Sequence, residues 1–231
     1  MIFINPAHGG YDNGGGSNIF FKEKDLVLKI SKYQLERFNE LGIDAVLIRN
    51  DDYFLSTNDR ITIINNQAKE NDLLISNHLN YGEDTGVEII YSIKTKAVLP
   101  NIISQKIKEK NQCIRNAYQK FDRTGLDFYD ILKYSSCKDK LLIYYGFSDN
   151  NQDVDNLIYH WMDLAEIIVE SCANYLKVPY SCPTKTIYIA KKIESIHDVA
   201  EEFKTSPEKI KKDNNLSTDI VYPNTEIIIN N

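Results

Sequence analysis

The sequence lacks three features that would each define a class of protein. Its longest apolar runs, such as residues 141–143 and 227–229, are far too short to span a membrane. The formal net charge is −6, so we expect no basic face that would bind a nucleic acid. None of the four cysteines shows the Cys-x-x-Cys spacing of a zinc knuckle: Cys113, Cys137, Cys172 and Cys182. We interpret them as free thiols rather than as a disulfide scaffold.

We also expect no removable leader at the N-terminus. A secretory leader needs a basic end, an apolar stretch and a cleavage site. Here Met1 leads directly into an apolar run, and a candidate site residue, His8, follows at once. We therefore expect synthesis in the cytoplasm without a signal peptide, and action on an extracellular target only after cell lysis or release.

What the sequence does contain is a regular alternation of strand and helix patterns. It has 231 residues, of which 42% are hydrophobic and 26% charged, as in a globular protein with ample core. Apolar runs predict strands at residues 2–5, 43–48, 72–76, 87–92 and 140–145. Helical spacing predicts helices at residues 24–41, 60–69, 100–118 and 154–176. This order predicts an α/β fold with a mostly parallel twisted sheet flanked by helices.

A short segment with two prolines separates a small C-terminal part from the rest. We predict a first domain at residues 1–178, a linker at 179–185 and a second domain at 186–231. The second domain shows a strand, two helices and a strand, at residues 187–190, 195–203, 207–214 and 226–229. This β-α-α-β unit is near the lower size limit for independent folding.

Three candidate metal ligands stand at corresponding places in the predicted fold. His8 follows the first strand, His78 follows the strand at residues 72–76, and Glu23 directly precedes the first helix. Ligands bind beyond the carboxyl ends of parallel strands. Two imidazoles and a carboxylate form the ligand set of a catalytic zinc site with an open fourth position. Their spacing alone is also compatible with ordinary polar loop residues.

Several sequence blocks are similar to those of zinc-dependent N-acetylmuramoyl-L-alanine amidases. The three main blocks are Asn5-Pro6-Ala7-His8-Gly9-Gly10-Tyr11-Asp12, Lys22-Glu23-Lys24-Asp25-Leu26 and Ile75-Ser76-Asn77-His78-Leu79-Asn80. Further residues fit the family pattern in the same order: Arg49, Asp52, Arg60, Asn65, Gly86-Val87-Glu88 and Tyr145-Gly146-Phe147. The resemblance covers roughly residues 2–180.

This resemblance implies a peptidoglycan hydrolase of the endolysin or autolysin type. Its reaction would be cleavage of the amide between N-acetylmuramic acid and L-alanine, with the glycan strand and stem peptide of peptidoglycan as partners. By position, His8, Glu23 and His78 inherit the role of Zn²⁺ ligands, and Asn80 that of a substrate-binding residue.

One position departs from the family, whose catalytic glutamate is replaced here by Tyr144. A phenol with a pKa near 10 is protonated at neutral pH, so it cannot accept the proton of the attacking water. It can still donate a hydrogen bond to a developing oxyanion. Either another group transfers the proton, with Glu88 and Asp149 as candidates, or the chain is a catalytically impaired homologue that binds or regulates peptidoglycan. A hydrolase of another amide is a third possibility.

The C-terminal part resembles a LysM domain. The similar blocks are Ile187-Tyr188-Ile189-Ala190, Ser195-Ile196-His197-Asp198-Val199-Ala200, Ile210-Lys211-Lys212-Asp213-Asn214-Asn215-Leu216 and Ile220-Val221-Tyr222-Pro223. The resemblance implies a shallow groove for N-acetylglucosamine-containing glycans, lined by Ser195, Ile196, Asn215, Leu216, Asp219 and Ile220. Ile193-Glu194 replaces the Gly-Asp pair expected in the first loop, so a spacer or protein-contact domain is the alternative.

Overall fold

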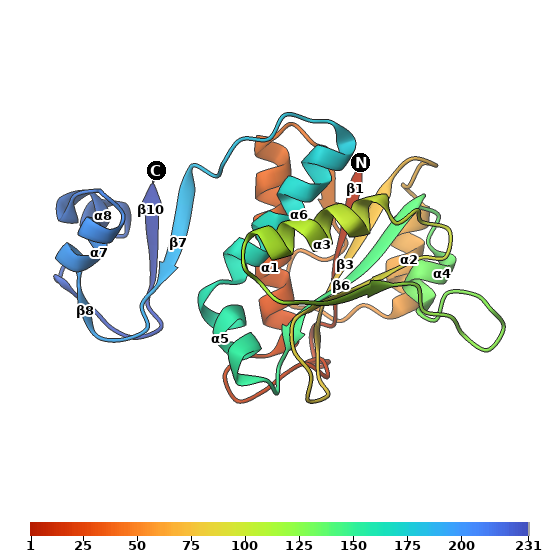
Figure 1. Cartoon of the computed structure of the whole chain (residues 1–231), viewed down its shortest axis with the longest axis horizontal. Helices are drawn as coiled ribbons and strands as arrows, with labels where there is room; N and C mark the ends of the chain where they lie inside the picture. The colour runs from red at the N-terminus through yellow and green to blue at the C-terminus, as the bar shows by residue number, and fades with distance from the viewer. Residues whose placement is uncertain (231) are drawn as a thin grey trace. The chain divides into compact units, whose positions relative to one another are not determined.

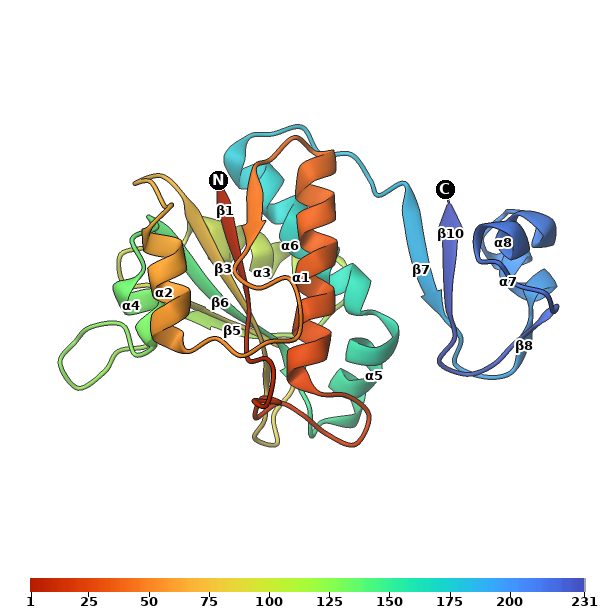
Figure 2. The same cartoon turned by 180° about the vertical axis from the view of Figure 1, so that it is seen from behind.

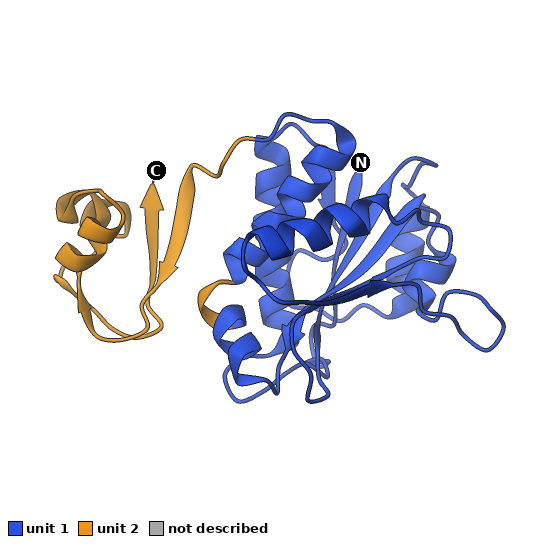
Figure 3. Cartoon of the chain, viewed as in Figure 1, with its two compact units in different colours: residues 1–157, 161–180 blue, residues 158–160, 181–231 orange. Residues whose placement is uncertain are grey.

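The computed structural model describes residues 1–230 and divides the chain into two compact units (Figure 3). Unit 1 comprises residues 1–157 and 161–180, and unit 2 comprises residues 158–160 and the chain from 181 onward. The predicted linker spans residues 179–185. In the structure the first strand of unit 2 starts at Lys185, the last residue of that predicted linker. Each unit is described by itself below.

A six-stranded sheet forms the centre of unit 1 (Figure 1). Its order is β2-β1-β3-β6-β4-β5, with bounds Ala45–Leu47, Ile2–Pro6, Leu73–Asn80, Asp139–Phe147, Val87–Tyr91 and Ile114–Tyr118. The first four of these strands are mutually parallel, β4 runs antiparallel to β6, and β5 is parallel to β4. The predicted α/β fold with a mostly parallel sheet is confirmed.

Helices cover both faces of the sheet (Figures 1 and 2). One face is covered by α1 (Glu23–Glu40), α3 (Val98–Glu109) and α6 (Trp161–Leu176), and α6 packs against both α1 and α3. On the other face lie α2 (Thr57–Asn65) and the short α4 (Asp130–Tyr134), above a buried apolar cluster. The remaining helix of unit 1, α5, spans Asn151–Tyr159.

Two predicted helices differ from the structure. The pattern at residues 100–118 is not one helix, because α3 ends at Glu109 and Asn111 adopts a left-handed backbone with φ 54°. The chain then forms the edge strand β5, which pairs with β4, so tertiary pairing overrides the helical spacing. The pattern at residues 154–176 is interrupted at His160 and forms α5 and α6.

Strand register places the candidate catalytic residues on one face of the sheet. In β3 and β6, His78 lies opposite Tyr144, and in β4 and β6, Glu88 lies opposite the same Tyr144. Side chains of directly opposed residues project to the same face. Since β1, β3 and β6 are parallel, their carboxyl ends and the loops that follow meet at one edge of the sheet.

Unit 2 is a small β-α-α-β domain. Strands β7 (Lys185–Ile189) and β10 (Glu226–Asn230) pair antiparallel, and helices α7 (Ile196–Glu202) and α8 (Pro207–Asp213) lie between them in sequence. Two-residue strands β8 (Glu194–Ser195) and β9 (Ile220–Val221) also pair. Its core contains eight buried apolar residues: Ala190, Ile196, Val199, Ala200, Ile210, Val221, Ile227 and Ile229. The predicted arrangement of unit 2 is confirmed.

Candidate metal centre and cleft

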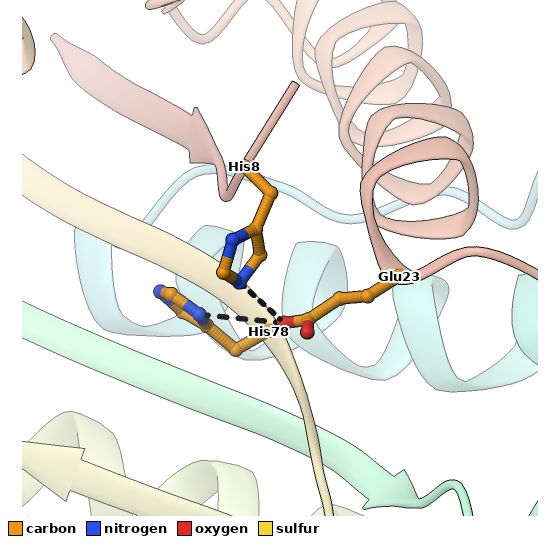
Figure 4. Close-up of side chains that lie close together, drawn as sticks. All are labelled: His8, Glu23 and His78. Carbon is orange, nitrogen blue, oxygen red and sulfur yellow. Dashed lines mark ion pairs between the residues drawn. The ribbon is translucent and has the colours of Figure 1, made fainter. Parts of the chain in front are cut away.

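The three predicted metal ligands converge at the carboxyl edge of the sheet (Figure 4). Nε2 of His8 lies 3.3 Å from Oε1 of Glu23, and Nδ1 of His78 lies 3.6 Å from the same oxygen. One ligand atom from each residue lies within 4.8 Å of the other two. Among the described residues this is the one such group of three histidine, cysteine or acidic side chains.

Hydrogen bonds on the far side of each ring fix which nitrogen faces the centre. Nδ1 of His8 donates to Oδ2 of Asp12 at 2.8 Å, because a carboxylate can only accept. Nε2 of His78 is hydrogen-bonded to the hydroxyl of Ser76 at 2.9 Å. The nitrogen of His8 that faces Glu23 therefore carries a lone pair when the ring is neutral, whereas the Ser76 hydroxyl can donate to Nε2 of His78 or accept from it. Such outer partners orient the histidine ligands of metal sites.

The carboxylate of Glu23 is held by the backbone of two loops. Oε2 accepts the N–H of Gly16 at 2.8 Å, and Oε1 accepts the N–H of Leu79 at 3.0 Å. Burial raises the pKa of Glu23, but hydrogen bonds from the His78 and His8 rings, when the facing nitrogen carries a proton, outweigh burial and hold the pKa well below its ordinary value. The buried carboxylate is thus ionised and oriented toward the two rings.

This donor set fits a zinc ion. A neutral His8 ring would point a lone pair at the Glu23 carboxylate, and a cation between the two removes that repulsion. Ligand atoms about 2.0–2.1 Å from a tetrahedral zinc lie roughly 3.3 Å from one another. The two separations from Glu23 Oε1, 3.3 and 3.6 Å, are close to that value. Three protein ligands also leave one position open for water or substrate.

Two buried arginines hold the turn that carries His8. His8 has a left-handed backbone with φ 58°, a conformation that costs about 1–2 kcal/mol for a residue with a Cβ. Arg60 donates to the carbonyls of His8 and Pro6 at 2.6 Å each and to Oδ1 of Asn5 at 2.7 Å. Arg49 donates to the carbonyls of Pro6 and Ala7 at 3.2 and 2.8 Å. Burial lowers the pKa of Arg60 to about 10, so it stays charged at neutral pH.

Gly14 is required by the close packing around the centre. Its φ is +88°, and a Cβ at this position would lie 2.4 Å from Oε2 of Glu23 and 2.7 Å from Cδ2 of His8. Any other residue would displace one of these two side chains. The glycine-rich loop thus lets the backbone approach the ligands.

Tyr144 lies beside the centre as a neutral phenol. Its ring is 5.6 Å from the His78 ring, centroid to centroid, and its hydroxyl is hydrogen-bonded to the hydroxyl of Tyr129 at 3.1 Å. Burial and the hydrogen bond to Tyr129 raise the pKa of Tyr144 above its ordinary value. The structure therefore places a protonated hydroxyl, and not a base, at the position where the resemblance implies a catalytic glutamate. Tyr129 could not be predicted from the sequence, because it comes from a segment outside the blocks that carry the resemblance.

Glu88 is engaged elsewhere. Its carboxylate forms an ion pair with Arg115, and Oε2 accepts from Nδ2 of Asn80 at 2.8 Å. It is not part of the group that converges with the two histidines. This arrangement gives Glu88 the role of fixing Asn80 and Arg115 beside the cleft, and as a substitute base it stays a prediction.

A cleft of about 550 Å³ opens from the metal centre along the sheet face that carries α2 and α4. Its lining includes both histidines, the loop before α2, and the segment that leads into α4. Its walls combine aromatic and aliphatic side chains with a similar number of polar and charged ones: Asn5, Ala7, His8, Asp12, Phe54, Leu55, Ser56, Thr57, Arg60, His78, Phe128, Tyr129, Asp130, Ile131 and Leu142. A concave site of this kind beside a metal centre is typical of a substrate cleft.

The predicted groove residues of unit 2 have different exposures. Ile220 is exposed, Asp219 is exposed and paired with Lys211, and Asn215 has a left-handed backbone with φ 53°. Ser195 caps α7 by accepting from the N–H of His197, and Leu216 packs against the core. Ile196 is fully buried in that core, so it offers no surface for contact with a glycan.

No helix among residues 1–230 is long and apolar enough to cross a membrane. This agrees with the short apolar runs of the sequence.

Comparison with known proteins gives two family matches. Residues 2–174 match the model of the N-acetylmuramoyl-L-alanine amidase family, and residues 188–230 match the model of the LysM domain. The amidase model thus covers most of unit 1, including all three converging side chains.

Individual relatives are similar mainly over unit 1. The uncharacterized protein YqiI of Bacillus subtilis is 29% identical over 160 residues, which are 68% of this chain and 74% of that protein. The sporulation-specific N-acetylmuramoyl-L-alanine amidase of the same organism is 39% identical over 89 residues, 38% of this chain. The chain spans about a third of the length of that amidase and of LytC, a further amidase of the same organism.

Solved structures show the same fold. The N-acetylmuramoyl-L-alanine amidase of Clostridium difficile 630 superposes with a TM-score of 0.63 at 29% identity, covering 76% of this chain and 96% of that structure. The catalytic domain of CwlV from Paenibacillus polymyxa superposes with a TM-score of 0.67 at 18% identity, covering 77% and 98%. Together with the family match over residues 2–174, these likenesses show that the chain belongs to the N-acetylmuramoyl-L-alanine amidase family and carries a C-terminal LysM domain.

Proposed function

We propose that this protein hydrolyses the amide between N-acetylmuramic acid and L-alanine in peptidoglycan, with a Zn²⁺ held by His8, Glu23 and His78. The observation that carries the proposal is the convergence of Nε2, Oε1 and Nδ1 of these residues at one edge of the sheet. Zinc bound there would polarise the scissile carbonyl and lower the pKa of water.

The other residues of the site would orient the ligands or donate hydrogen bonds, and none of them acts as a general base. Asp12 and Ser76 hold the imidazole rings in the orientation that ligation needs. Tyr144 is protonated and can donate a hydrogen bond to negative charge that develops on the substrate carbonyl oxygen. Because no carboxylate stands at this position, we expect turnover lower by about 10²–10⁴ than in a site with a placed general base.

Unit 2 would hold the enzyme on its substrate. Ser195, Asn215, Leu216, Asp219 and Ile220 are the residues that we propose to contact N-acetylglucosamine-containing glycan. A second binding site on the same chain raises the effective concentration of the cleft at the wall, which matters most for a slow enzyme.

A second candidate function is peptidoglycan binding with little or no turnover. The observation that favours it is Tyr144 itself, together with the engagement of Glu88 by Arg115 and Asn80. In that case the metal centre and the cleft would serve recognition alone.

Digestion of purified peptidoglycan by three zinc-loaded proteins distinguishes these functions. The wild type, Tyr144→Phe and Tyr144→Glu are compared by the rate at which L-alanine amino termini appear, with Tyr134→Phe as a control on an exposed tyrosine. For an amidase that uses its phenol, Tyr144→Phe is slower by about 10-fold or more, and Tyr144→Glu is faster. Turnover in Tyr144→Glu alone would support the binding function, and none in any variant would refute the hydrolase.

A further inference from the structure

The cleft beside the metal centre has an aromatic platform on one wall. Phe54 lines the cleft and stacks on Tyr11, with ring centroids 4.4 Å apart and planes 24° apart. Both rings are open to solvent, with exposed fractions of 39% for Phe54 and 81% for Tyr11. Two large apolar faces so exposed are unfavourable in water unless they serve a contact.

A second pair of aromatic rings stands on another part of the lining. Phe128 and Tyr129 line the cleft, in an edge-to-face arrangement with centroids 5.0 Å apart. Phe128 is 49% exposed. These residues belong to the segment between β5 and α4, whereas Phe54 precedes α2, so segments distant in sequence supply the two pairs.

Hydrogen bonds to an aspartate next to or near the aromatic residues hold both walls in place before any ligand binds. The carboxylate of Asp127, next to Phe128, accepts from the Ser92 hydroxyl at 2.7 Å and from the N–H of Ile93 at 2.8 Å. On the other wall, Asp52 accepts from Lys24 Nζ at 2.6 Å and from the N–H of Gly10 at 2.7 Å. Ordering a ligand between such walls costs little protein entropy.

Apart from the proposed zinc, the side chains that line the cleft disfavour an anionic ligand. The cleft lining contains two carboxylates, those of Asp12 and Asp130. The one arginine of the lining, Arg60, is occupied by the acceptors of the His8 turn. A stem peptide carries carboxylates, whereas a pyranose ring is neutral, has hydroxyls at its edge and presents C–H groups on its faces.

We propose that this cleft binds the sugar side of the substrate, with N-acetylated pyranose rings packed against Phe54 and Phe128. The proposal rests on the proposed function, since it assigns which side of the scissile amide lies in the cleft. On this proposal, Phe54 and Phe128 determine the specificity of the enzyme for a stem peptide that is still attached to glycan. The stem peptide then leaves the metal centre in the other direction.

Ring-proton NMR on the zinc-free full chain tests the proposal without any turnover. Phenylalanine rings are labelled, and the protein is titrated with the neutral tetramer of N-acetylglucosamine and, separately, with the peptide L-alanyl-γ-D-glutamyl-L-lysine. Phe203, which packs against the core of unit 2, reports glycan binding there, and the exposed Phe20, outside the cleft lining, is the control.

We expect the tetramer to shift the signals of Phe54 and Phe128 in a saturable way and to leave Phe20 unchanged. Phe128→Ala should weaken the affinity read from Phe54 by about 3- to 10-fold, since one aromatic contact is worth about 0.5–1.5 kcal/mol. Shifts of Phe54 and Phe128 with the peptide and not with the tetramer would overturn the proposal, as would tetramer shifts confined to Phe203. Peptidoglycan digestion with no shift of the cleft rings would refute this assignment alone. Ring shifts without digestion would refute the proposed activity alone.

Discussion

Replacement of Arg60 by lysine should loosen the turn that presents His8 and weaken zinc binding. The guanidinium donates to four acceptors: the carbonyls of Leu55, Pro6 and His8 and Oδ1 of Asn5. A lysine keeps the charge, but its single nitrogen cannot reach all four acceptors that the three nitrogens of the planar guanidinium bind. About two buried acceptors would lose their partner, each at a cost of roughly 1–2 kcal/mol.

The expected loss of stability for Arg60→Lys is therefore about 2–4 kcal/mol, or a decrease in Tm of roughly 5–15 °C. Since partners outside the ligand shell typically contribute 10–100-fold to metal affinity, zinc affinity should fall by about that factor. Thermal unfolding and competition with a chromophoric chelator measure the two effects. Arg123→Lys, at an exposed position, is the matched control. Zinc affinity within twofold of wild type and an unchanged Tm would refute the role given to Arg60.

Three further predictions concern the loop, the metal and the segment before α4. Gly14→Ala should abolish tight zinc binding while the fold persists, because its Cβ would displace Glu23 or His8; retained zinc in a competition titration would contradict this. Removing zinc with a chelator should lower the Tm of the wild type and leave the Tm of Glu23→Gln unchanged. With zinc at 100 times its Kd, the loss in free energy of unfolding would be about 2.7 kcal/mol. An equal decrease in Tm for both proteins would refute the ligand role. The interaction with Lys133 and, to a smaller extent, the hydrogen bond from Thr124 hold the pKa of Asp122 below its ordinary value. The ionised carboxylate therefore stabilises the folded protein above about pH 4, and this contribution is lost as the pH falls through the lower pKa of the folded state. Asp122→Asn should thus have a lower Tm than wild type at pH 7, with the gap shrinking below about pH 4; a gap that grows at acid pH would contradict this sign.

Much of the site could be predicted from the sequence, because its residues follow from strand ends and motif blocks. His8 and His78 lie at the carboxyl ends of the parallel strands β1 and β3, which meet at one edge of the sheet. Glu23 is the first residue of α1, the helix that follows β1. The structure brings their ligand atoms together within 4.8 Å. The partners Asp12 and Ser76 carry a weaker signal, because short-range spacing alone does not show which nitrogen they bind.

The rest depends on contacts that sequence patterns do not encode. The strand β5 shows a spacing that continues the helical pattern of α3, and only its pairing with β4 decides its conformation. Tyr129 and Phe128 reach the cleft from a loop of irregular sequence, so their proximity to Tyr144 and the metal centre is a tertiary property. The roles of Arg49 and Arg60 likewise follow from backbone carbonyls, which a sequence does not place.

The identity of the bond that the zinc-loaded protein cleaves tests the central claim most directly. Mass spectrometry of the soluble products from purified peptidoglycan resolves free stem peptides from glycan-borne ones. We predict intact stem peptides that begin with L-alanine, together with glycan strands whose lactyl groups end in a free carboxylate, and neither product from Glu23→Gln. Peptides cut at another bond, or no soluble peptide from fully zinc-loaded protein, would contradict the assignment of this site as an amidase.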